Sequence, residues 1–302
     1  MNRISHWIVV NILLLHTLSS LAQYYYYDKR YYYNNAVVEI GGSGGIMNCL
    51  TDIGGRQGIG KRFIKDLNVN FSRPCFGLYV IAMFKDAIGI RLEGTFGSVQ
   101  AYDSILKQVA SSTYGRYERN LSFRTSIAEL QLSAEIHPLF FKSYNESQSP
   151  FFSPYLIAGM GLFSFNPKTY LDGQWYYLHP LQTEGQGFAE YPERKRYKLL
   201  QLAILAGIGL KYEINSIVNI RLELIHRFLF TDYLDDVSHK NYVDPLLFDN
   251  YLPASQAVLA RQLYKRAKMG FTSGQRGNPE NKDAFFNLQF KIGFCLRKKV
   301  VW

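Results

Sequence analysis

The sequence predicts an all-β protein, namely an eight-stranded antiparallel up-and-down transmembrane β-barrel with long extracellular loops. Apolar and polar residues alternate along eight segments of about ten residues, the length of a tilted membrane-spanning strand. The connections between these segments alternate between long and short, as they do in outer-membrane barrels. An apparent secretion signal precedes them, and no later run reaches the roughly 18 apolar residues of a transmembrane helix.

The amino terminus has the features of a secretory signal peptide. Arg3 supplies the positive charge, residues 7–15 (WIVVNILLL) are apolar, and Ser20-Leu21-Ala22 is a small-residue cleavage site. Cleavage near Ala22 and a later closed barrel would place the protein in the cell outer membrane. The expected division is a signal peptide over residues 1–22, a Tyr-rich periplasmic segment over 23–36 and the outer-membrane β-barrel over 37–302.

The composition narrows the class of partner. The formal net charge is +10 and aromatic residues make up 16% of the chain. Because the basic residues are scattered and the chain is exported, we expect no nucleic-acid partner. The positive balance suits outer-membrane lipid and the phosphates of lipopolysaccharide, and the aromatic content suits the two interfacial girdles of a membrane barrel.

The first half of the chain contains five expected strands. They are residues 37–47, 75–85, 87–96, 126–136 and 153–165. The first alternates with glycines, which allow a strand to bend or to approach a neighbour closely. A tight turn at Asp86 joins the second and third, whereas residues 50–73 and 97–120 are expected to be long loops and 137–150 a moderate turn.

The second half begins with the clearest pattern in the sequence, residues 198–214 and 217–230 on either side of Asn215-Ser216. Mostly large apolar residues occupy one face of each arm, and the charged residues lie on the other face, so period two predicts a hairpin. A buried helix is the alternative for residues 198–210, but two glycines disfavour it. The eighth strand is expected at 284–296. Long loops are expected at 166–196 and 231–283, the latter with a helix across 254–268.

The charged strand residues fall on one face, which becomes the barrel lumen. Ile90-Arg91-Leu92-Glu93 recurs as Ile220-Arg221-Leu222-Glu223, and each copy sends a cation and an anion to that face. An eight-stranded barrel has room inside only for side chains, so these charges are expected to pair rather than line a pore. A soluble lipocalin-like barrel with the charges around a ligand is the alternative. The expected lumen charge network is Arg91, Glu93, Glu129, Glu135, Lys211, Glu213, Arg221, Glu223, Arg227 and Lys291.

Two loop segments carry residues of catalytic type. Residues 231–239 (TDYLDDVSH) hold the candidate loop site Asp232, Asp235, Asp236 and His239, which could bind a cation or act as acid and base. A hydrogen-bonded cap that orders the last loop is the favoured interpretation. Residues 55–61 (GRQGIGK) resemble a phosphate-binding loop, but Arg62 stands where Ser or Thr should hold magnesium. We assign no catalytic residue, no metal ligand and no cofactor.

The cysteines allow one bridge. Cys49 ends the first strand and Cys75 begins the second, so a Cys49–Cys75 disulfide would close the first loop. Free thiols are the favoured interpretation and this bridge is the alternative, while Cys295 lies near the opposite end of the barrel, too far away to join.

Two motifs carry a family resemblance. Residues 39–45 (EIGGSGG) followed by 52–55 (DIGG), and residues 231–238 (TDYLDDVS) after a long strand, resemble a Bacteroidota outer-membrane barrel family with a domain of unknown function that includes PorG-like proteins. The resemblance would extend over residues 37–296. It implies an outer-membrane component of the type IX secretion machinery that associates with a periplasmic ring.

The expected function is therefore a non-enzymatic anchor or accessory component of an envelope assembly, with periplasmic secretion-ring proteins as partners. The alternatives are an outer-membrane hydrolase with a loop site and a surface binding or adhesin barrel.

Overall fold

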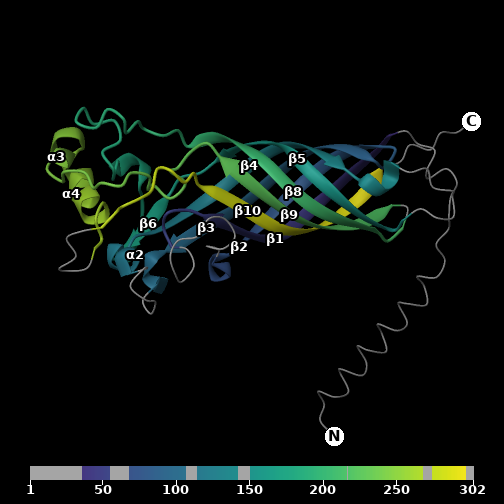
Figure 1. Cartoon of the computed structure of the whole chain (residues 1–302), viewed down its shortest axis with the longest axis horizontal. Coiled ribbons are helices and arrows are strands. Elements are labelled where there is room, and N and C mark those ends of the chain that lie inside the picture. The colour runs from purple at the N-terminus through teal and green to yellow at the C-terminus, as the bar shows by residue number, and fades with distance from the viewer. Residues whose placement is uncertain are drawn as a thin grey trace, which may run out of the picture.

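The computed structural model describes residues 36–54, 68–106, 114–141, 150–215, 217–267 and 274–296. Eight long strands form its body (Figure 1). They are β1 (Ala36–Leu50), β2 (Arg73–Phe84), β3 (Ile88–Tyr102), β4 (Ser122–Ile136), β5 (Phe152–Ser164), β8 (Leu200–Glu213), β9 (Val218–Leu229) and β10 (Ala284–Leu296).

Smaller elements lie in the connections. They are the hairpin β6 (Lys168–Leu171) and β7 (Gln174–Tyr177), the helices α2 (Tyr114–Arg119), α3 (Leu247–Tyr251) and α4 (Ala254–Leu263), and four 3₁₀ turns at Val69–Phe71, Asp103–Leu106, Pro138–Phe141 and His179–Leu181. The long connections gather at one end of the barrel, opposite the short turns and the N-terminus of β1 (Figure 1).

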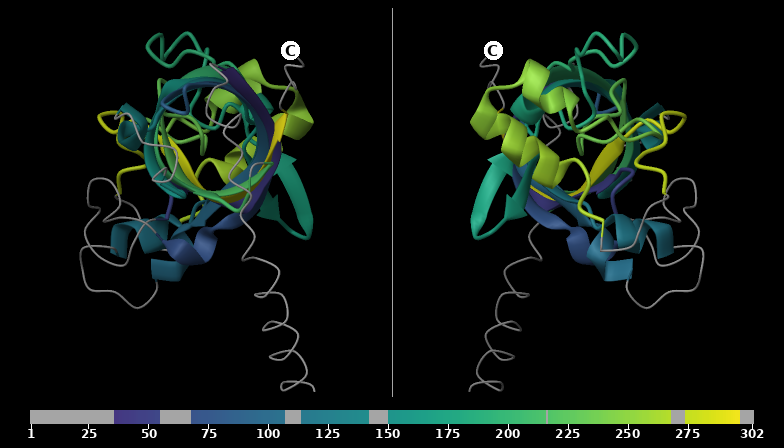
Figure 2. Two further views of the ribbon diagram at one scale, coloured as in Figure 1. Left: turned by 90° about the vertical axis from the view of Figure 1, so that its right-hand side faces the viewer. Right: turned by 90° about the vertical axis from the view of Figure 1, so that its left-hand side faces the viewer.

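The eight long strands close into a barrel. Each strand pairs antiparallel with its neighbour in the chain, β5 pairs with β8 past the small hairpin, and β10 returns to pair with β1. The view along the axis shows the closed ring (Figure 2). The predicted fold class is confirmed, because the described residues form an all-β, closed, antiparallel barrel of eight strands.

Some expected boundaries are wrong. Residues 97–120 do not form one loop, because β3 continues to Tyr102 and pairs there with Ser122 at the start of β4. Beyond Phe96 the outward residues become polar, so the strand leaves the apolar layer without ending. The loop over 166–196 contains the β6–β7 hairpin, and the helix expected over 254–268 ends at Leu263. Residues 1–35 and 55–67, which include the signal peptide, the Tyr-rich segment and the phosphate-loop-like motif, lie outside the described residues.

The two short turns on the opposite side follow from local chemistry. Lys85 and Asp86 both have left-handed backbones, with φ of 50° and 52°, and the backbone N–H of Ala87 donates to the carbonyl of Phe84 at 3.0 Å, which closes a tight turn between twisted strands. Between β8 and β9, Asn215 Oδ1 accepts hydrogen bonds from the backbone N–H groups of Ile217 at 2.9 Å and Val218 at 2.8 Å. Both turns fix the register of the strands that they join.

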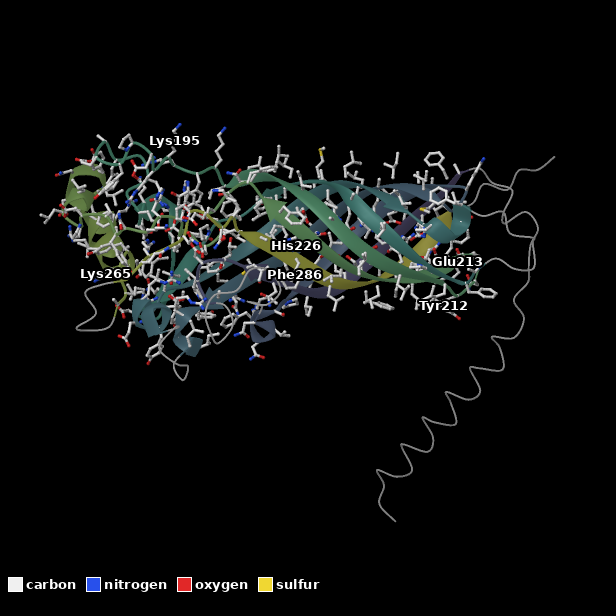
Figure 3. The ribbon with its side chains drawn as sticks, viewed as in Figure 1. Lys195, Tyr212, Glu213, His226, Lys265 and Phe286 are labelled. Carbon is white, nitrogen blue, oxygen red and sulfur yellow. The ribbon has the colours of Figure 1, made fainter. Side chains whose placement is uncertain are left out.

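The outer wall is apolar and exposed. On β8 and β9, the outward residues Ile208 and Phe228 are 59% and 44% exposed, whereas the inward Leu205 and Arg227 are buried. The same belt continues on the other strands through Leu78, Ile90, Leu92, Leu130, Leu132, Leu156, Met160, Phe290 and Ile292. Side chains stand out along the whole wall (Figure 3). Among the described residues, no helix is long and apolar enough to cross a membrane.

An apolar belt of this extent is stable only against lipid, because a soluble protein rarely exposes more than a few hundred Å² of contiguous apolar surface. The chain is therefore a transmembrane barrel of the outer-membrane type. The soluble lipocalin-like alternative is wrong, since its outer surface would have to be polar.

Because the outer wall faces lipid, the stability lost on substituting an outward residue by Arg should depend on the depth of that residue in the membrane. Ile208 lies midway between Leu202 and Ile214 on the outer face of β8, and Ile214 lies at its short-turn end. Ile208→Arg should lower the free energy of unfolding from a bilayer by about 2–4 kcal/mol, and Ile214→Arg by about 0–1 kcal/mol. Denaturant unfolding of the protein in lipid vesicles measures both. Equal losses at the two positions would contradict the membrane assignment.

Candidate functional site

The lumen holds all ten charged residues that the sequence places there, and every one of them is buried. They come from five of the eight strands, β3, β4, β8, β9 and β10. Glu39 of β1, which the sequence did not identify, adds a buried charge from a sixth strand. Five cations therefore meet six carboxylates among the described lumen residues. The charges are nearly balanced, as a closed low-dielectric interior requires.

At the middle of the lumen, Arg91 reaches from β3 to the opposite wall. Its Nη1 donates to Glu135 Oε1 on β4 and to Glu223 Oε1 on β9, both at 2.7 Å. Lys291 on β10 lies beside it, with Nζ 2.5 Å from Glu93 Oε2 and 2.9 Å from Glu223 Oε2. This central cluster ties four strands together across the barrel.

Arg221 extends the ion pairs towards the short-turn end. Its Nη1 lies 2.7 Å from Glu135 Oε2 and its Nη2 lies 2.7 Å from Glu39 Oε2. Nearer the turn, Lys211 Nζ lies 2.8 Å from Glu213 Oε1. The pairs therefore run from β4 through β9 to β1 without an interruption.

Arg227 closes the ion-paired region towards the long loops. Its guanidinium donates to both oxygens of Glu129, at 2.8 Å from Nη2 to Oε2 and 3.2 Å from Nε to Oε1. It also donates to Gln131 Oε1 at 3.1 Å and to Asn287 Oδ1 at 2.6 Å. Above it lies an apolar cluster that includes Met47, Phe123, Phe163 and Phe285. The lumen is thus filled by ion pairs in one half and by packed apolar side chains in the other.

Sequence reasoning missed two tyrosines in this network. Tyr79 Oη donates to Glu39 Oε1 at 2.6 Å, and Tyr155 Oη donates to Glu223 Oε1 at 2.5 Å. Glycines make room for both rings. A Cβ on Gly41 would come within 2.6 Å of Tyr79, and a Cβ on Gly209 within 2.2 Å of Tyr155. The glycines of the first strand thus serve the close approach that the sequence suggested.

The long loops form a folded cap above the barrel. Arg119 of the second loop donates to Asp103 Oδ1 and Oδ2 at 2.9 and 2.8 Å, to the carbonyl of Asp52 in the first loop at 2.7 Å, and to the carbonyl of Arg276 in the last loop. Arg276 in turn lies 2.9 Å from Glu184 of the third loop. Two buried arginines therefore connect all four long connections.

The candidate loop site is part of this cap. Asp235 accepts from the backbone N–H groups of Ile53 at 3.0 Å and Val237 at 2.9 Å. Asp236 accepts from Thr183 Oγ1 at 2.5 Å and Tyr197 Oη at 2.6 Å. Both carboxylates hold loop backbone or side chains in place, which is the capping role that the sequence favoured.

His239 and Asp232 differ from this pair. The backbone N–H of His239 donates to Glu184 Oε2 at 3.1 Å, and its ring lies 6.4 Å from the ring of Tyr233. Both carboxylate oxygens of Asp232 are buried, and no residue that the structure describes forms a hydrogen bond of normal geometry with them. Among the described residues, no hydrogen bond or ion pair joins the His239 ring to these carboxylates, and no group of His, Cys, Asp and Glu is arranged to hold a metal ion.

Buried carboxyl groups lie close together where the first loop meets the two ends of the last loop, and their pKa values are raised. Burial raises the pKa of Asp232 to about 8, and burial raises that of Asp52 to about 6. Burial and the charge of neighbouring carboxylates also raise the pKa of Asp235 and Asp283 well above the usual range. Asp283 is fixed here because it accepts from the backbone N–H of Leu234 at 2.8 Å.

The alternative of a Cys49–Cys75 disulfide is wrong. Cys49 and Cys75 are both buried free thiols. The register pairs Cys75 with Gly45, four residues before Cys49, which itself pairs with Phe285. Four residues of strand span about 13 Å, whereas a disulfide needs Cα atoms within about 7 Å.

A cavity of about 750 Å³ opens beside the cap, between the first loop and the start of β10. Its lining includes Asp52, Arg116, Arg119, Lys282 and Asp283, together with apolar Phe71. Mixed charge and an apolar wall suit a small polar ligand.

The lumen network predicts a large loss of stability when one central cation is removed. Arg221→Met leaves Glu39 and Glu135 buried without their main partner, so the free energy of unfolding should fall by about 3–5 kcal/mol. Denaturant unfolding in lipid vesicles measures it. Lys195→Met on the exposed cap is the control and should cost under 0.5 kcal/mol. A loss at Arg221 no greater than the control would refute the interpretation.

The cap predicts a loss of order as the pH rises. The unfolded pKa of Asp is about 3.9, so the raised values of Asp52 and Asp232 mean that the folded cap binds protons that the unfolded chain releases. This stability is present near pH 4 and is lost as the pH rises through about 6 and 8. Hydrogen exchange of residues 231–239 should therefore be faster at pH 8.5 than at pH 5.5, after correction for the intrinsic rate.

Asp232→Asn removes the buried charge and should slow that exchange at pH 8.5. Asp172→Asn, at an exposed turn, is the control and should leave it unchanged. Identical exchange in the two variants would count against a repulsive cluster.

Comparison with known proteins finds similarity only to solved structures of distantly related sequence. No protein-family model matches the chain, and no curated protein matches it. The chain is similar to the solved structure of the outer membrane protein OprG from Pseudomonas aeruginosa, with 12% identity, a TM-score of 0.37 and coverage of 87% of this chain and 97% of that chain. Ail, the attachment invasion locus protein of Yersinia pestis, has 10% identity and a TM-score of 0.35, with coverage of 86% of this chain and 97% of that chain. Neisserial surface protein A has 7% identity and a TM-score of 0.33, with coverage of 86% of this chain and 97% of that chain. The fold assignment rests on the register and the wall of this barrel itself.

Proposed function

We propose that the protein is a non-enzymatic anchor or accessory component of an envelope assembly in the outer membrane, and that this assembly is the type IX protein secretion system. The filled lumen carries the proposal. Arg91, Arg221 and Lys291 each form an ion pair across the lumen with a strand that is not their neighbour, Arg91 with Glu223, Arg221 with Glu135 and Lys291 with Glu93, so the barrel offers a partner its surfaces rather than a channel.

The choice of assembly rests on the resemblance of residues 39–45 and 231–238 to PorG-like proteins. In this chain the first motif supplies Glu39 and the glycine that accommodates Tyr79, and the second supplies the capping carboxylates Asp235 and Asp236. Both motifs therefore have a structural role that a family of such barrels would share. Periplasmic ring proteins are the proposed partners, and lipopolysaccharide is the proposed lipid environment.

The cavity beside the cap favours one alternative, a surface barrel that binds a small polar ligand through Arg116 and Lys282. A loop hydrolase has less support, because Asp235 and Asp236 already accept two hydrogen bonds each, three of them from other loops and one from Val237 of the same loop. Replacing Asp235, Asp236 and His239 together tests the hydrolase alternative. If the protein is a hydrolase, the variant should change the composition of the envelope lipids or the amount of the enzyme's substrates, and an unchanged envelope would count against it.

Deletion of the gene tests the secretion role. Cargo proteins of the type IX system should accumulate in the periplasm and disappear from the medium, and the full-length gene should restore them. Immunoblots of the two fractions measure the distribution. Cross-linking of intact cells, followed by purification of the barrel, should capture a periplasmic ring protein. Normal secretion together with no captured ring protein would refute the proposal.

A further inference from the structure

The β6–β7 hairpin carries an aromatic and cationic face. Lys168 pairs with Tyr177, and Tyr170 pairs with Trp175. Paired residues of antiparallel strands share a face, so these four side chains point the same way. The three rings are 47%, 51% and 39% exposed for Tyr170, Tyr177 and Trp175. The opposite face packs against the cap through Tyr176, so the hairpin has one exposed face and one that is packed against the cap.

This face continues the lipid-facing wall of the barrel. Lys168 also pairs with Arg124 of β4, and Arg124 belongs to the outward series that includes the exposed Leu130 and Leu132. The hairpin lies at the long-loop end of the barrel (Figure 1) and stands out from its side (Figure 2). The aromatic face therefore looks towards the membrane rather than into the cap.

The depth of the patch matches the headgroup layer. The apolar belt on β4 ends at Ala128, which pairs with Phe96, the last large apolar outward residue of β3. Arg124 lies four residues further on, about 13 Å along a tilted strand. The hydrocarbon core ends with the apolar belt, so Arg124 and the hairpin lie among the polar headgroups of the outer leaflet.

The two cations converge on one ring, and no acidic residue in the described part of the chain pairs with them. Arg124 Cζ lies 5.7 Å and Lys168 Nζ 5.4 Å from the ring centroid of Trp175, and Lys168 Nζ lies 5.8 Å from that of Tyr177. Within the described part of the chain, neither cation forms an ion pair with a carboxylate. The acidic residue of the hairpin, Asp172, lies in its turn, and its negative charge interacts with Arg266.

The hairpin is held in position before any ligand arrives. Ser122 Oγ and Thr169 Oγ1 lie 2.9 Å apart, and Arg266 Nη1 donates to them at 3.2 and 3.3 Å. At the base, the backbone N–H of Leu178 donates to the carbonyl of Pro167 at 2.9 Å. A preformed site loses less entropy on binding.

We propose that this face binds the phosphorylated headgroup of lipopolysaccharide, through Arg124 and Lys168 on phosphate and through Tyr170, Trp175 and Tyr177 on the adjoining sugars. Arg and Lys are the residues that pair with phosphate oxygens, and Trp and Tyr favour the membrane interface. The site is independent of the secretion role. It gives the barrel a fixed lipid neighbour at one side of its wall.

Binding of purified lipid A to the full-length protein in detergent tests the site. Native mass spectrometry should show tighter binding of bisphosphorylated lipid A than of the same lipid after removal of its phosphates. The double variant R124Q/K168Q should bind the bisphosphorylated lipid roughly 30-fold more weakly, at about fivefold for each cation near an anionic surface. The matched control K195Q/R196Q removes one Lys and one Arg from the exposed cap and should bind normally.

Three results would overturn the proposal. They are equal binding of the two lipids by the wild type, equal binding by the two double variants, and displacement of the lipid by an equal concentration of inorganic phosphate, which would indicate a site for free anions. Far-UV circular dichroism checks that R124Q/K168Q folds. If it does not fold, Trp175→Leu replaces it, with the same expected loss of lipid binding.

Discussion

The narrow lumen is the constraint on which the rest of the structure depends. Eight strands leave space only for side chains, and a charge inside that space is tolerable only beside an opposite charge. Arg91 and Arg221 satisfy this requirement by contacting carboxylates on several strands at once. Glycines such as Gly209 complete the fit, because a side chain there would collide with Tyr155.

The same constraint separates scaffold from function. The ion pairs fill the half of the lumen near the short turns, and the apolar cluster around Phe123 and Phe285 fills the other half. The cap rests on that apolar layer, and Arg119 and Arg276 bind its loops together. What the molecule can offer to other molecules therefore lies outside: the cap with its cavity, the flanking hairpin and the periplasmic edge.

Period-two alternation was sufficient to predict the strands and the ten lumen charges, because it depends only on which side of the backbone each residue occupies. It failed where the two faces of a strand differ little, and where the outward face of a strand changes from apolar to polar. Glu39 lies in a Gly-rich strand that has little contrast between its faces, and β3 beyond Phe96 turns polar while it remains a strand. The disulfide failed for another reason, since the distance from Cys49 to Cys75 depends on the register. The cluster of Asp52, Asp232, Asp235 and Asp283 depends on which loops meet, and no local pattern records that.

The lumen ion pairs also bear on how such a barrel is assembled. Arg91 and Glu223 are 132 residues apart in the chain, Glu39 and Arg221 are 182 apart, and Glu93 and Lys291 are 198 apart. Lys291 arrives on the last strand, so every intermediate that lacks β10 leaves Glu93 and Glu223 short of a cation. Contacts of such long range form slowly. Incomplete barrels are therefore electrically unbalanced, and insertion should proceed as one cooperative closure rather than hairpin by hairpin.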